Sequence, residues 1–212
     1  MLREEWLKNR ITMIGGSDAS AILGMNPYKS NLDVWREKTG RVIPEDIGSR
    51  PYVQYGIRAE QYLTSLFALD YPAYQVKANM DFTVYRHPKY PFIGGTLDGE
   101  LLEKETGRRG ILEVKTTEIL NSMHREKWND KIPDNYYIQV LHYLLATGWD
   151  FAILKAQLKT VYNCNDVRLN TRHYFVDRAD VKEDLEYLLE QEIEFWGFIE
   201  SEKMPPLTLP II

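Results

Sequence analysis

The sequence lacks the features that would place the protein at a membrane, outside the cell or on a metal–sulfur site. Cys164 is the one cysteine among 212 residues, so the chain cannot form an internal disulfide or a cysteine-based zinc or iron–sulfur site. No apolar run approaches the roughly 20 residues that span a bilayer. The first residues include Glu4 and Glu5 and no apolar leader segment. We therefore expect a cytoplasmic protein that does not associate with membranes.

A basic excess is also missing, because 31 acidic residues outnumber 26 basic ones and the net charge is −5. Proteins that coat DNA usually have the opposite balance, although an enzyme with a local basic groove remains compatible with this charge. No glycine-rich phosphate fingerprint follows a predicted strand, which leaves a small-molecule enzyme without support. The sequence contains no internal repeat, and its length fits one domain, residues 1–212, with a full core.

Cap and turn residues divide the chain into helices and strands. A short helix is predicted to begin at Ser17 or Asp18 and to stop at Gly24, and a second begins with the capping box of Ser30 and Asp33. Longer helices are predicted over residues 52–67, 134–147 and 179–199, and strands over residues 74–78, 82–86, 92–102, 111–117, 151–159 and 168–176. This order predicts an α/β fold of the α+β kind, with a central mixed sheet flanked by helices.

Three charged residues lie on two strands that we expect to pair as a hairpin. Glu113 and Lys115 point to the same face because side chains alternate along a strand, and Asp98 lies on the partner strand. Two carboxylates and the carbonyl of Val114 offer the oxygen ligands that Mg²⁺ or Mn²⁺ prefers. Lys115 can orient or deprotonate a water aimed at a phosphodiester. The alternative interpretation is a plain solvated strand face.

Glu60 borders the apolar stripe of the helix predicted over residues 52–67. The residues of that stripe are Val53, Ile57, Leu63 and Phe67. A carboxylate against apolar surface needs a partner, because burying a bare charge is costly. A metal or Lys115 would be such a partner. The alternative is that Glu60 pairs with Arg58 or another surface cation, or lies at the edge of the stripe.

Further polar candidates lie on two other predicted helices. Gln139 is next to the apolar face of the helix over residues 134–147, where a surface amide is the common outcome, and His142 is more typical of a packed histidine. Near Ser17, free N–H groups behind two glycines can hold a phosphate, and Arg10 can add a bidentate contact. Simple helix capping is the alternative there.

Several ordered blocks of sequence together resemble YqaJ-type viral recombinases, the phage exonuclease group that includes lambda exonuclease, in the PD-(D/E)xK nuclease superfamily. The blocks are RITMIGGSDASAILG (10–24), NPY (26–28), WREKTG (35–40), GIRAE (56–60), GTLDG (95–99), LEVKT (112–116) and YYIQV (136–140). The proline of the superfamily name is absent, since Leu97 stands before Asp98. The core motifs thus occupy residues 10–147, and residues 150–212 hold the C-terminal strands, helix and tail.

The resemblance implies a restriction-endonuclease-like core and a role for each candidate. The implied metal ligands are Glu60, Asp98, Glu113 and the carbonyl of Val114. Lys115 matches the catalytic lysine, and Gln139 matches a glutamine on the helix that follows the core. Arg10 and Ser17 are placed like residues that anchor a terminal 5′-phosphate.

The implied activity is Mg²⁺-dependent hydrolysis of linear double-stranded DNA, 5′ to 3′, with Mn²⁺ as a possible substitute. The resemblance also implies a trimeric ring around duplex DNA and a partner that anneals single strands in phage-type recombination. An endonuclease of the same superfamily and a non-catalytic DNA-binding or assembly protein on a nuclease scaffold are the alternatives. Cleavage of a closed circular duplex would indicate the endonuclease. The absence of Mg²⁺ or Mn²⁺ binding in a calorimetric titration would indicate the non-catalytic protein.

Overall fold

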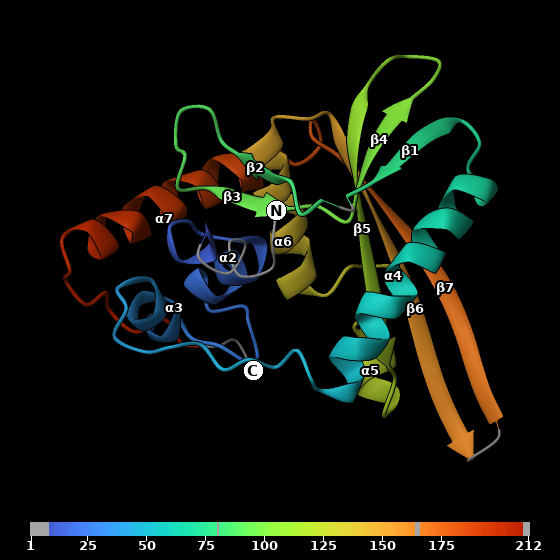
Figure 1. Ribbon diagram of the computed structural model, residues 1–212, viewed down its shortest axis with the longest axis horizontal. Coiled ribbons are helices and arrows are strands. Elements are labelled where there is room, and N and C mark those ends of the chain that lie inside the picture. The colour runs from blue at the N-terminus through green and yellow to red at the C-terminus, as the bar shows by residue number, and fades with distance from the viewer. Residues whose placement is uncertain (1–8, 80, 164–165, 210–212) are drawn as a thin grey trace.

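A five-stranded mixed sheet lies at the centre of the computed structural model, which describes residues 9–79, 81–163 and 166–209 (Figure 1). Its strands, in spatial order, are Tyr74–Ala78 (β1), Gly99–Glu103 (β4), Arg109–Glu118 (β5), Phe151–Asn163 (β6) and Asp166–Asp177 (β7). The β5–β6 pair is parallel, and the other three pairs are antiparallel. The predicted mixed sheet is confirmed.

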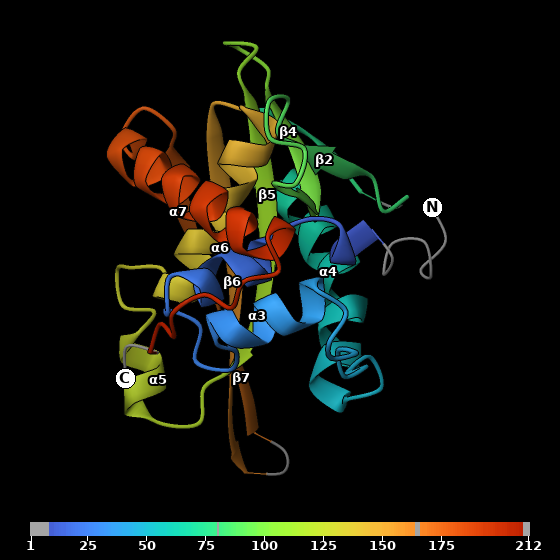
Figure 2. The same ribbon diagram turned by 90° about the vertical axis from the view of Figure 1, so that its left-hand side faces the viewer.

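Helices cover both faces of this sheet. They are Gly16–Ile22 (α2), Asn31–Lys38 (α3), Pro51–Asp70 (α4), Ser122–Glu126 (α5), Asp134–Thr147 (α6) and Lys182–Glu200 (α7). α4 packs on the face that presents Leu112 and Val114, and α6 packs on the opposite face against Ala152 and Leu154. α2, α3 and α7 form a further layer beyond α6 (Figure 2). In the described ranges, none of these helices is long and apolar enough to cross a bilayer.

Residues 92–102 form two strands, so the prediction of a single strand there is wrong. Gly94–Thr96 (β3) pairs with Val84–Arg86 (β2) in a separate two-stranded sheet, whereas β4 joins the main sheet. Asp98 therefore lies in the connection just before β4 and not on the strand itself. Alternation could not reveal the break, because the side-chain pattern continues while the chain passes from one sheet to the other.

The two N-terminal caps have different outcomes. In α3, the predicted capping box is confirmed: Ser30 Oγ accepts the N–H of Asp33, and the Asp33 carboxylate accepts the N–H of Ser30. In α2, the N-cap is Gly15, so the prediction of Ser17 or Asp18 is wrong. Asp18 is the third helical residue, and its carboxylate accepts the N–H of Gly15 at 3.1 Å. A glycine cap has no side chain to recognise in the sequence.

The predicted inward stripe of α4 is partly wrong. Leu63 and Phe67 are buried as expected, but Ile57 is 58% exposed. Positions 57 and 63 are six residues apart, which is not a helical repeat, so the two cannot share a face. Gly56 turns inward instead; a Cβ there would lie 3.5 Å from Oγ1 of Thr116.

The remaining elements differ mainly at their ends. α6 has the predicted bounds and ends at Gly148, which has a φ of 69°. α7 begins three residues later than predicted, and the short α5 was not predicted. β6 and β7 extend past the predicted ends, which were residues 159 and 168. The extension forms a two-stranded ribbon that protrudes from the sheet (Figures 1 and 2).

A charged pair is buried between α6 and α7. His142 Nδ1 lies 2.6 Å from Glu192 Oε1, and His142 Nε2 lies 3.0 Å from the carbonyl oxygen of Gly94. Burial by itself lowers the pKa of His142, but the Glu192 carboxylate outweighs burial and raises that pKa above its usual value. The packed role expected for His142 agrees with these contacts.

We expect the free energy of unfolding to fall as pH rises through the elevated pKa of His142. A group whose folded pKa is raised stabilises the fold fully below its unfolded pKa, about 6.5, and the contribution is lost when the folded group deprotonates. Urea unfolding between about pH 6 and about pH 9 measures this. Glu192→Gln removes the charge that holds the proton, so a pH slope equal to that of the wild type would contradict the prediction.

Candidate active site

The candidate site lies where β4 stops short beside β5. The register of these strands ends at the pair of Gly99 with Leu112. Beyond that pair, Asp98 replaces a strand partner, because its Oδ2 accepts the N–H of Val114 at 2.7 Å. The hairpin thus brings Asp98 to the strand that carries Glu113 and Lys115, although Asp98 itself is outside β4.

Glu113 is the most enclosed carboxylate of the group, at 1% exposed. Lys115 Nζ donates to Glu113 Oε1 at 2.5 Å, and Gln139 Nε2 donates to the same oxygen at 2.9 Å. The second oxygen, Oε2, is buried and has no hydrogen-bond partner among residues 9–79, 81–163 and 166–209. Buried polar atoms rarely lack a partner, so this oxygen indicates a place for a cation or another donor.

Glu60 approaches the same group from α4. Burial and then the negative charge of Asp98 raise the pKa of Glu60 to about 7, against the opposing effect of Lys115. Glu60 therefore lies close enough to Asp98 and Lys115 to respond to both charges. Arg58, the alternative partner, is exposed on another side of the helix.

Among the residues that the structure describes, Lys115 is the cation that acts on these carboxylates. Burial and then the charge of Asp98 raise the pKa of Glu113 to about 8, against the effect of Lys115. Burial also raises the pKa of Asp98, while Lys115, the Val114 N–H and the adjacent carboxyl group of Glu113 act in the other direction. Burial alone would lower the pKa of Lys115, but Glu113 and Asp98 raise it well above its usual range. Within the described ranges, one ammonium thus lies near three carboxyl groups, and a divalent cation would relieve their repulsion.

These residues fit Mg²⁺ or Mn²⁺. Within the described part of the chain, no three His, Cys, Asp or Glu side chains form a ready metal cage. Mg²⁺ does not require one, since it commonly binds one or two carboxylates and keeps several waters. Asp98 and Glu113 meet that minimum. The carbonyl of Val114 points to the same open strand edge as its N–H, because a strand residue presents both groups on one side.

Tyr143 also belongs to the site, and sequence reasoning missed it. Its buried hydroxyl accepts the second N–H of Gln139 Nε2 at 2.9 Å. Its ring lies against Gly16 and Gly95, where an added Cβ would meet ring atoms at 2.9 and 2.6 Å. Two signals were available: the four-residue spacing from Gln139, which shares a helix face, and glycines that permit close approach.

Tyr143→Phe should weaken Mg²⁺ binding and slow catalysis by about tenfold each, because partners that orient a metal ligand typically contribute 10–100-fold. The reason is that Gln139, once released by Tyr143, no longer holds Glu113 in place. Calorimetric Mg²⁺ titration and steady-state rates measure the two effects. The matched control is Tyr137→Phe on the same helix, whose hydroxyl donates to Asp184 at 2.6 Å. Equal effects of the two substitutions on Mg²⁺ affinity and on the rate would contradict this prediction.

Arg10 and Ser17 meet at the start of α2. Arg10 Nη2 donates to Ser17 Oγ at 3.2 Å, and Ser17 is exposed. Two lysines that sequence reasoning missed lie beneath them: Lys38 and Lys29 contact the buried Asp18 at 2.7 and 3.0 Å. Burial opposes ionisation of Asp18, yet Lys38, Lys29 and Arg10 hold its pKa well below its usual range.

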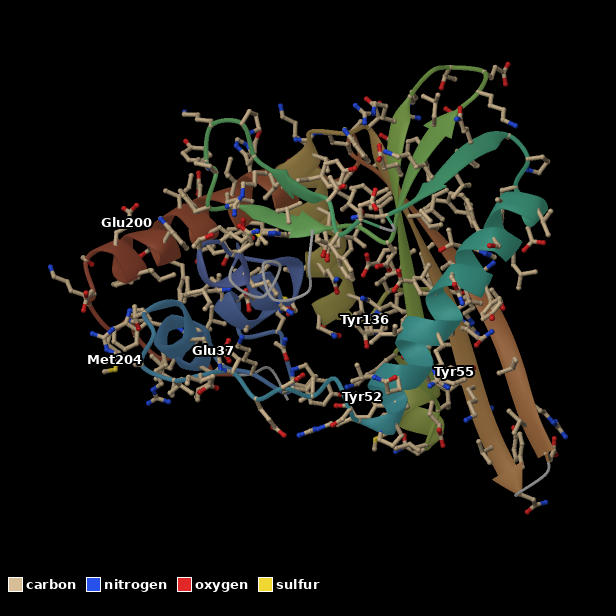
Figure 3. All side chains as sticks on the ribbon, in the orientation of Figure 1. Glu37, Tyr52, Tyr55, Tyr136, Glu200 and Met204 are labelled. Carbon is tan, nitrogen blue, oxygen red and sulfur yellow. The ribbon has the colours of Figure 1, made fainter. Side chains whose placement is uncertain are left out.

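This basic cluster is coupled to the carboxylates by direct packing. A Cβ on Gly16 would lie 2.8 Å from Cγ of Gln139, the residue that donates to Glu113. On the other side, Lys115 Nζ lies 5.2 Å from the ring centroid of Tyr136, which projects between α6 and α4 (Figure 3). The structure therefore brings Glu60, Asp98, Glu113, Lys115 and Gln139 together in one group. Arg10 and Ser17 form a second group beside it.

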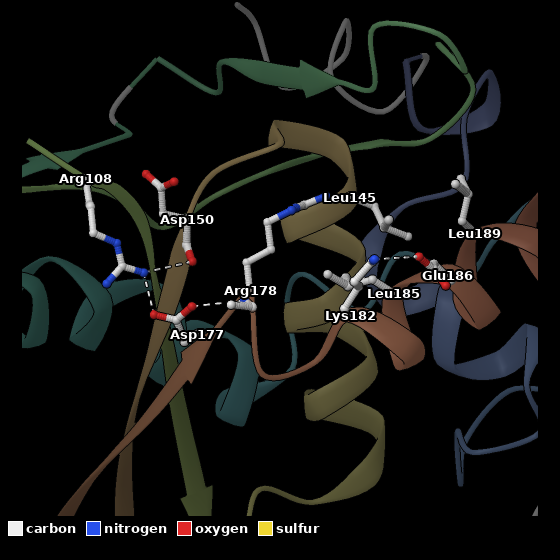
Figure 4. A pocket seen from close by; sticks show the side chains of 10 residues that line it. Arg108, Leu145, Asp150, Asp177, Arg178, Lys182, Leu185, Glu186 and Leu189 are labelled. Atoms are coloured by element: carbon white, nitrogen blue, oxygen red, sulfur yellow. Dashed lines mark hydrogen bonds and ion pairs between the residues drawn. The ribbon is translucent and has the colours of Figure 1, made fainter.

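A separate cavity of about 500 Å³ lies at the end of the sheet where β5 begins and β7 ends (Figure 4). Its lining includes Arg108 and Asp177, which form an ion pair, and Lys182 and Glu186, which form another. None of the candidate site residues lines it. Its lining also includes Asp150 and Arg178, so acidic and basic side chains are equal in number there, unlike in the carboxylate group.

The family model of the YqaJ-like viral recombinase domain matches residues 5–150. The chain belongs to this family. The YqaJ-like chain is 33% identical over 203 residues to the uncharacterized protein YqaJ of Bacillus subtilis (strain 168), covering 93% of the chain and 56% of that protein. It is 27% identical over 157 residues to the uncharacterized protein R354 of Acanthamoeba polyphaga mimivirus, covering 69% of the chain and 27% of that protein. The chain thus spans about half or less of these relatives.

Two solved exonuclease structures share the fold. The alkaline exonuclease LHK-Exo from Laribacter hongkongensis matches with a TM-score of 0.65 and 16% identity over 94% of both chains. A phage-related exonuclease from Haemophilus somnus 129PT matches with a TM-score of 0.60 and 14% identity, over 90% of this chain and 96% of that one. The resemblance drawn from the sequence blocks is confirmed at the level of family and fold.

Proposed function

We propose that this chain is a Mg²⁺-dependent exonuclease that hydrolyses phosphodiesters of linear double-stranded DNA from 5′ to 3′. The observation that carries the proposal is the buried Oε2 of Glu113, which has no hydrogen-bond partner in the described part of the chain, within a group of three carboxyl groups near Lys115. Membership of a viral recombinase family and a fold shared with exonucleases support it. LHK-Exo has also been solved with dAMP, a mononucleotide of the kind such an enzyme would release.

The metal would be held by Glu60, Asp98, Glu113 and the carbonyl of Val114, with Mn²⁺ as a substitute for Mg²⁺. When bound, it supplies polarisation of a phosphoryl oxygen. Lys115 is held as an ammonium by its contact with Glu113, so it is suited to orienting a water and stabilising the charge that builds on the phosphate. The sequence also allowed Lys115 to take a proton from that water, but an ammonium that is already protonated fits this role less well. Gln139 and Tyr143 fix the carboxylate of Glu113.

The basic cluster of Arg10, Lys29 and Lys38 around Ser17 favours action from a DNA end. The Arg10 guanidinium reaches the exposed Ser17 hydroxyl at the start of α2, and guanidinium groups and helix N-termini are both groups that bind a terminal phosphate. An enzyme that must bind an end cannot cut a molecule without one.

The test is digestion of linear duplex with and without a 5′-phosphate, and of closed circular duplex, in Mg²⁺ and in chelator. We expect Mg²⁺-dependent release of mononucleotides from the linear molecule, faster with the 5′-phosphate, and an intact circle. A nicked or cut circle would indicate an endonuclease of the same superfamily. No cleavage together with no calorimetric Mg²⁺ or Mn²⁺ binding would indicate a non-catalytic DNA-binding or assembly protein.

Further parts of the proposal follow from the family. The chain would act as one domain over residues 1–212, in the cytoplasm of a bacterial or phage-infected cell. It would form a trimeric ring around duplex DNA and work in recombination beside a protein that anneals single strands. Light scattering of the purified chain tests the trimer, and co-purification tests the annealing partner.

A further inference from the structure

The ribbon formed by the outer ends of β6 and β7 continues the face of the sheet that carries the candidate site. β5 ends at Glu118, opposite Lys159, and beyond this point β6 and β7 pair with each other. Thr160 lies opposite Arg168, and the ribbon projects well past the rest of the sheet (Figures 1 and 2).

Two guanidinium groups converge on one tyrosine of this ribbon. Cζ of Arg168 in β7 lies 4.7 Å from the ring centroid of Tyr162 in β6, and Arg125 of α5 donates to the Tyr162 hydroxyl at 3.5 Å. Tyr162 is 51% exposed and the Arg168 side chain is 70% exposed. Asp166 pairs with Arg168 at 3.4 Å, so two cations face one carboxylate. Exposed arginine and tyrosine side chains are the groups that contact DNA phosphates and sugars.

The position of this cluster matches the path of a duplex. Lys115 pairs in register with Ala156, and Thr160, four residues further along β6 and so on the same face, pairs with Arg168, whose guanidinium lies over Tyr162. Tyr162 lies six residues beyond Ala156, at an irregularity of the strand between Val161 and Asn163. The separation along the strand is about 20 Å. That length corresponds to about six base pairs of B-DNA, and a two-stranded ribbon is narrow enough for the major groove.

The direction in which the DNA substrate would run through the site also points to the ribbon. α2, with Ser17, and the ribbon lie on opposite sides of β5 (Figure 1). If a 5′-phosphate sits beside Ser17 and the next phosphodiester lies at Glu113 and Lys115, then the DNA that has not yet been cut leaves toward Tyr162. In a 5′ to 3′ exonuclease acting on duplex, that DNA is still double-stranded.

We propose that the Arg125–Tyr162–Arg168 cluster binds the backbone of the uncut duplex about half a helical turn from the scissile phosphate. This inference rests on the proposed function, since the direction of the substrate is taken from it. The net charge of −5 makes such a local cluster significant, because the remaining surface repels DNA overall.

The experiment measures equilibrium binding of labelled DNA in chelator, where no cleavage occurs. On a duplex of about 20 base pairs, Arg168→Ala and Arg125→Ala should each bind about tenfold more weakly, and each should reduce the slope of log affinity against log salt by about one. On a duplex of about five base pairs, which ends before the ribbon, both should bind like the wild type. The matched control is Asp166→Ala in the same ribbon, which should bind the long duplex at least as tightly.

Two results would overturn the inference: equal affinities of the wild type and both arginine variants for the long duplex, or a loss confined to single-stranded DNA. Circular dichroism of each variant establishes that the fold is intact. Failure of the proposed function is separately visible, because it would show as absent nucleotide release by the wild type in Mg²⁺. Binding in chelator reports on the ribbon in either case.

Discussion

Lys115→Met is expected to lower the rate of nucleotide release by about 10³-fold, the upper part of the range for losing one group that stabilises transition-state charge. Methionine keeps most of the volume of lysine but removes the ammonium that contacts Glu113 at 2.5 Å and lies near Asp98. Both the stabilisation of the phosphate and the placement of the water depend on that charge. DNA affinity should change only slightly, because most phosphate contacts lie elsewhere.

Lys155→Met is the matched control for this substitution. Lys155 is also buried, and it lies opposite Val114 on the neighbouring strand, next to Lys115 in register. Its side chain belongs to the other face of the sheet, where it contacts Asp70 at 3.7 Å. Single-turnover rates of the two variants on 5′-phosphorylated linear duplex should therefore differ by orders of magnitude. If both variants keep the wild-type rate, Lys115 is not the catalytic lysine.

Features that depend on a few neighbouring residues were predictable from the sequence. The capping box of Ser30 and Asp33, the end of α6 at Gly148 and the hairpin between β4 and β5 all follow from local backbone chemistry. Each requires only that a short stretch satisfies its own hydrogen bonds or turn geometry.

Features that depend on packing were not predictable in this way. Residues 92–102 have a continuous strand pattern, yet they divide between two sheets, and the close approach of Gly95 to Tyr143 of α6 is a packing contact that the strand pattern does not contain. The exposure of Ile57 also depends on packing. The prediction that residue 57 is helical was correct, but Gly56 and Phe67, and not Ile57, lie on the side of α4 that faces the sheet.

The site shows the same division. Alternation placed Glu113 and Lys115 on one face, and the hairpin brought Asp98 beside them. Lys29 and Lys38 were missed because their role arises from contacts with the buried Asp18 of α2, which leave no periodic signal, whereas Tyr143 was missed although it lies four residues after Gln139 on the same helix face. The family resemblance supplied Gln139, whose hydrogen bond to Glu113 no local pattern contains.

Glu113→Gln is expected to have opposite effects on stability and activity. In chelator, the free energy of unfolding should rise by about 1–2 kcal/mol, the usual gain when a residue strained for function is replaced. The reason is that Glu113 is buried beside Asp98, with one oxygen that has no hydrogen-bond partner among the residues that the structure describes, and burial and repulsion already raise its pKa to about 8. The amide keeps an oxygen that can accept from Lys115 and Gln139, but it removes the charge. Nucleotide release should fall by about 10³-fold, because the metal loses a charged ligand.

Mg²⁺ should reverse the order of stability. At a concentration of about 100 times the dissociation constant, a ligand bound only by the folded state stabilises it by about 2.7 kcal/mol. The wild type should gain this, whereas Glu113→Gln should gain little, so their urea midpoints should cross between chelator and Mg²⁺. Glu118→Gln is the matched control, because Glu118 lies at the exposed end of the same strand; it should follow the wild type under both conditions. An equal Mg²⁺ response in Glu113→Gln would remove Glu113 from the metal site whatever its effect on activity, because the midpoint reports binding and not catalysis.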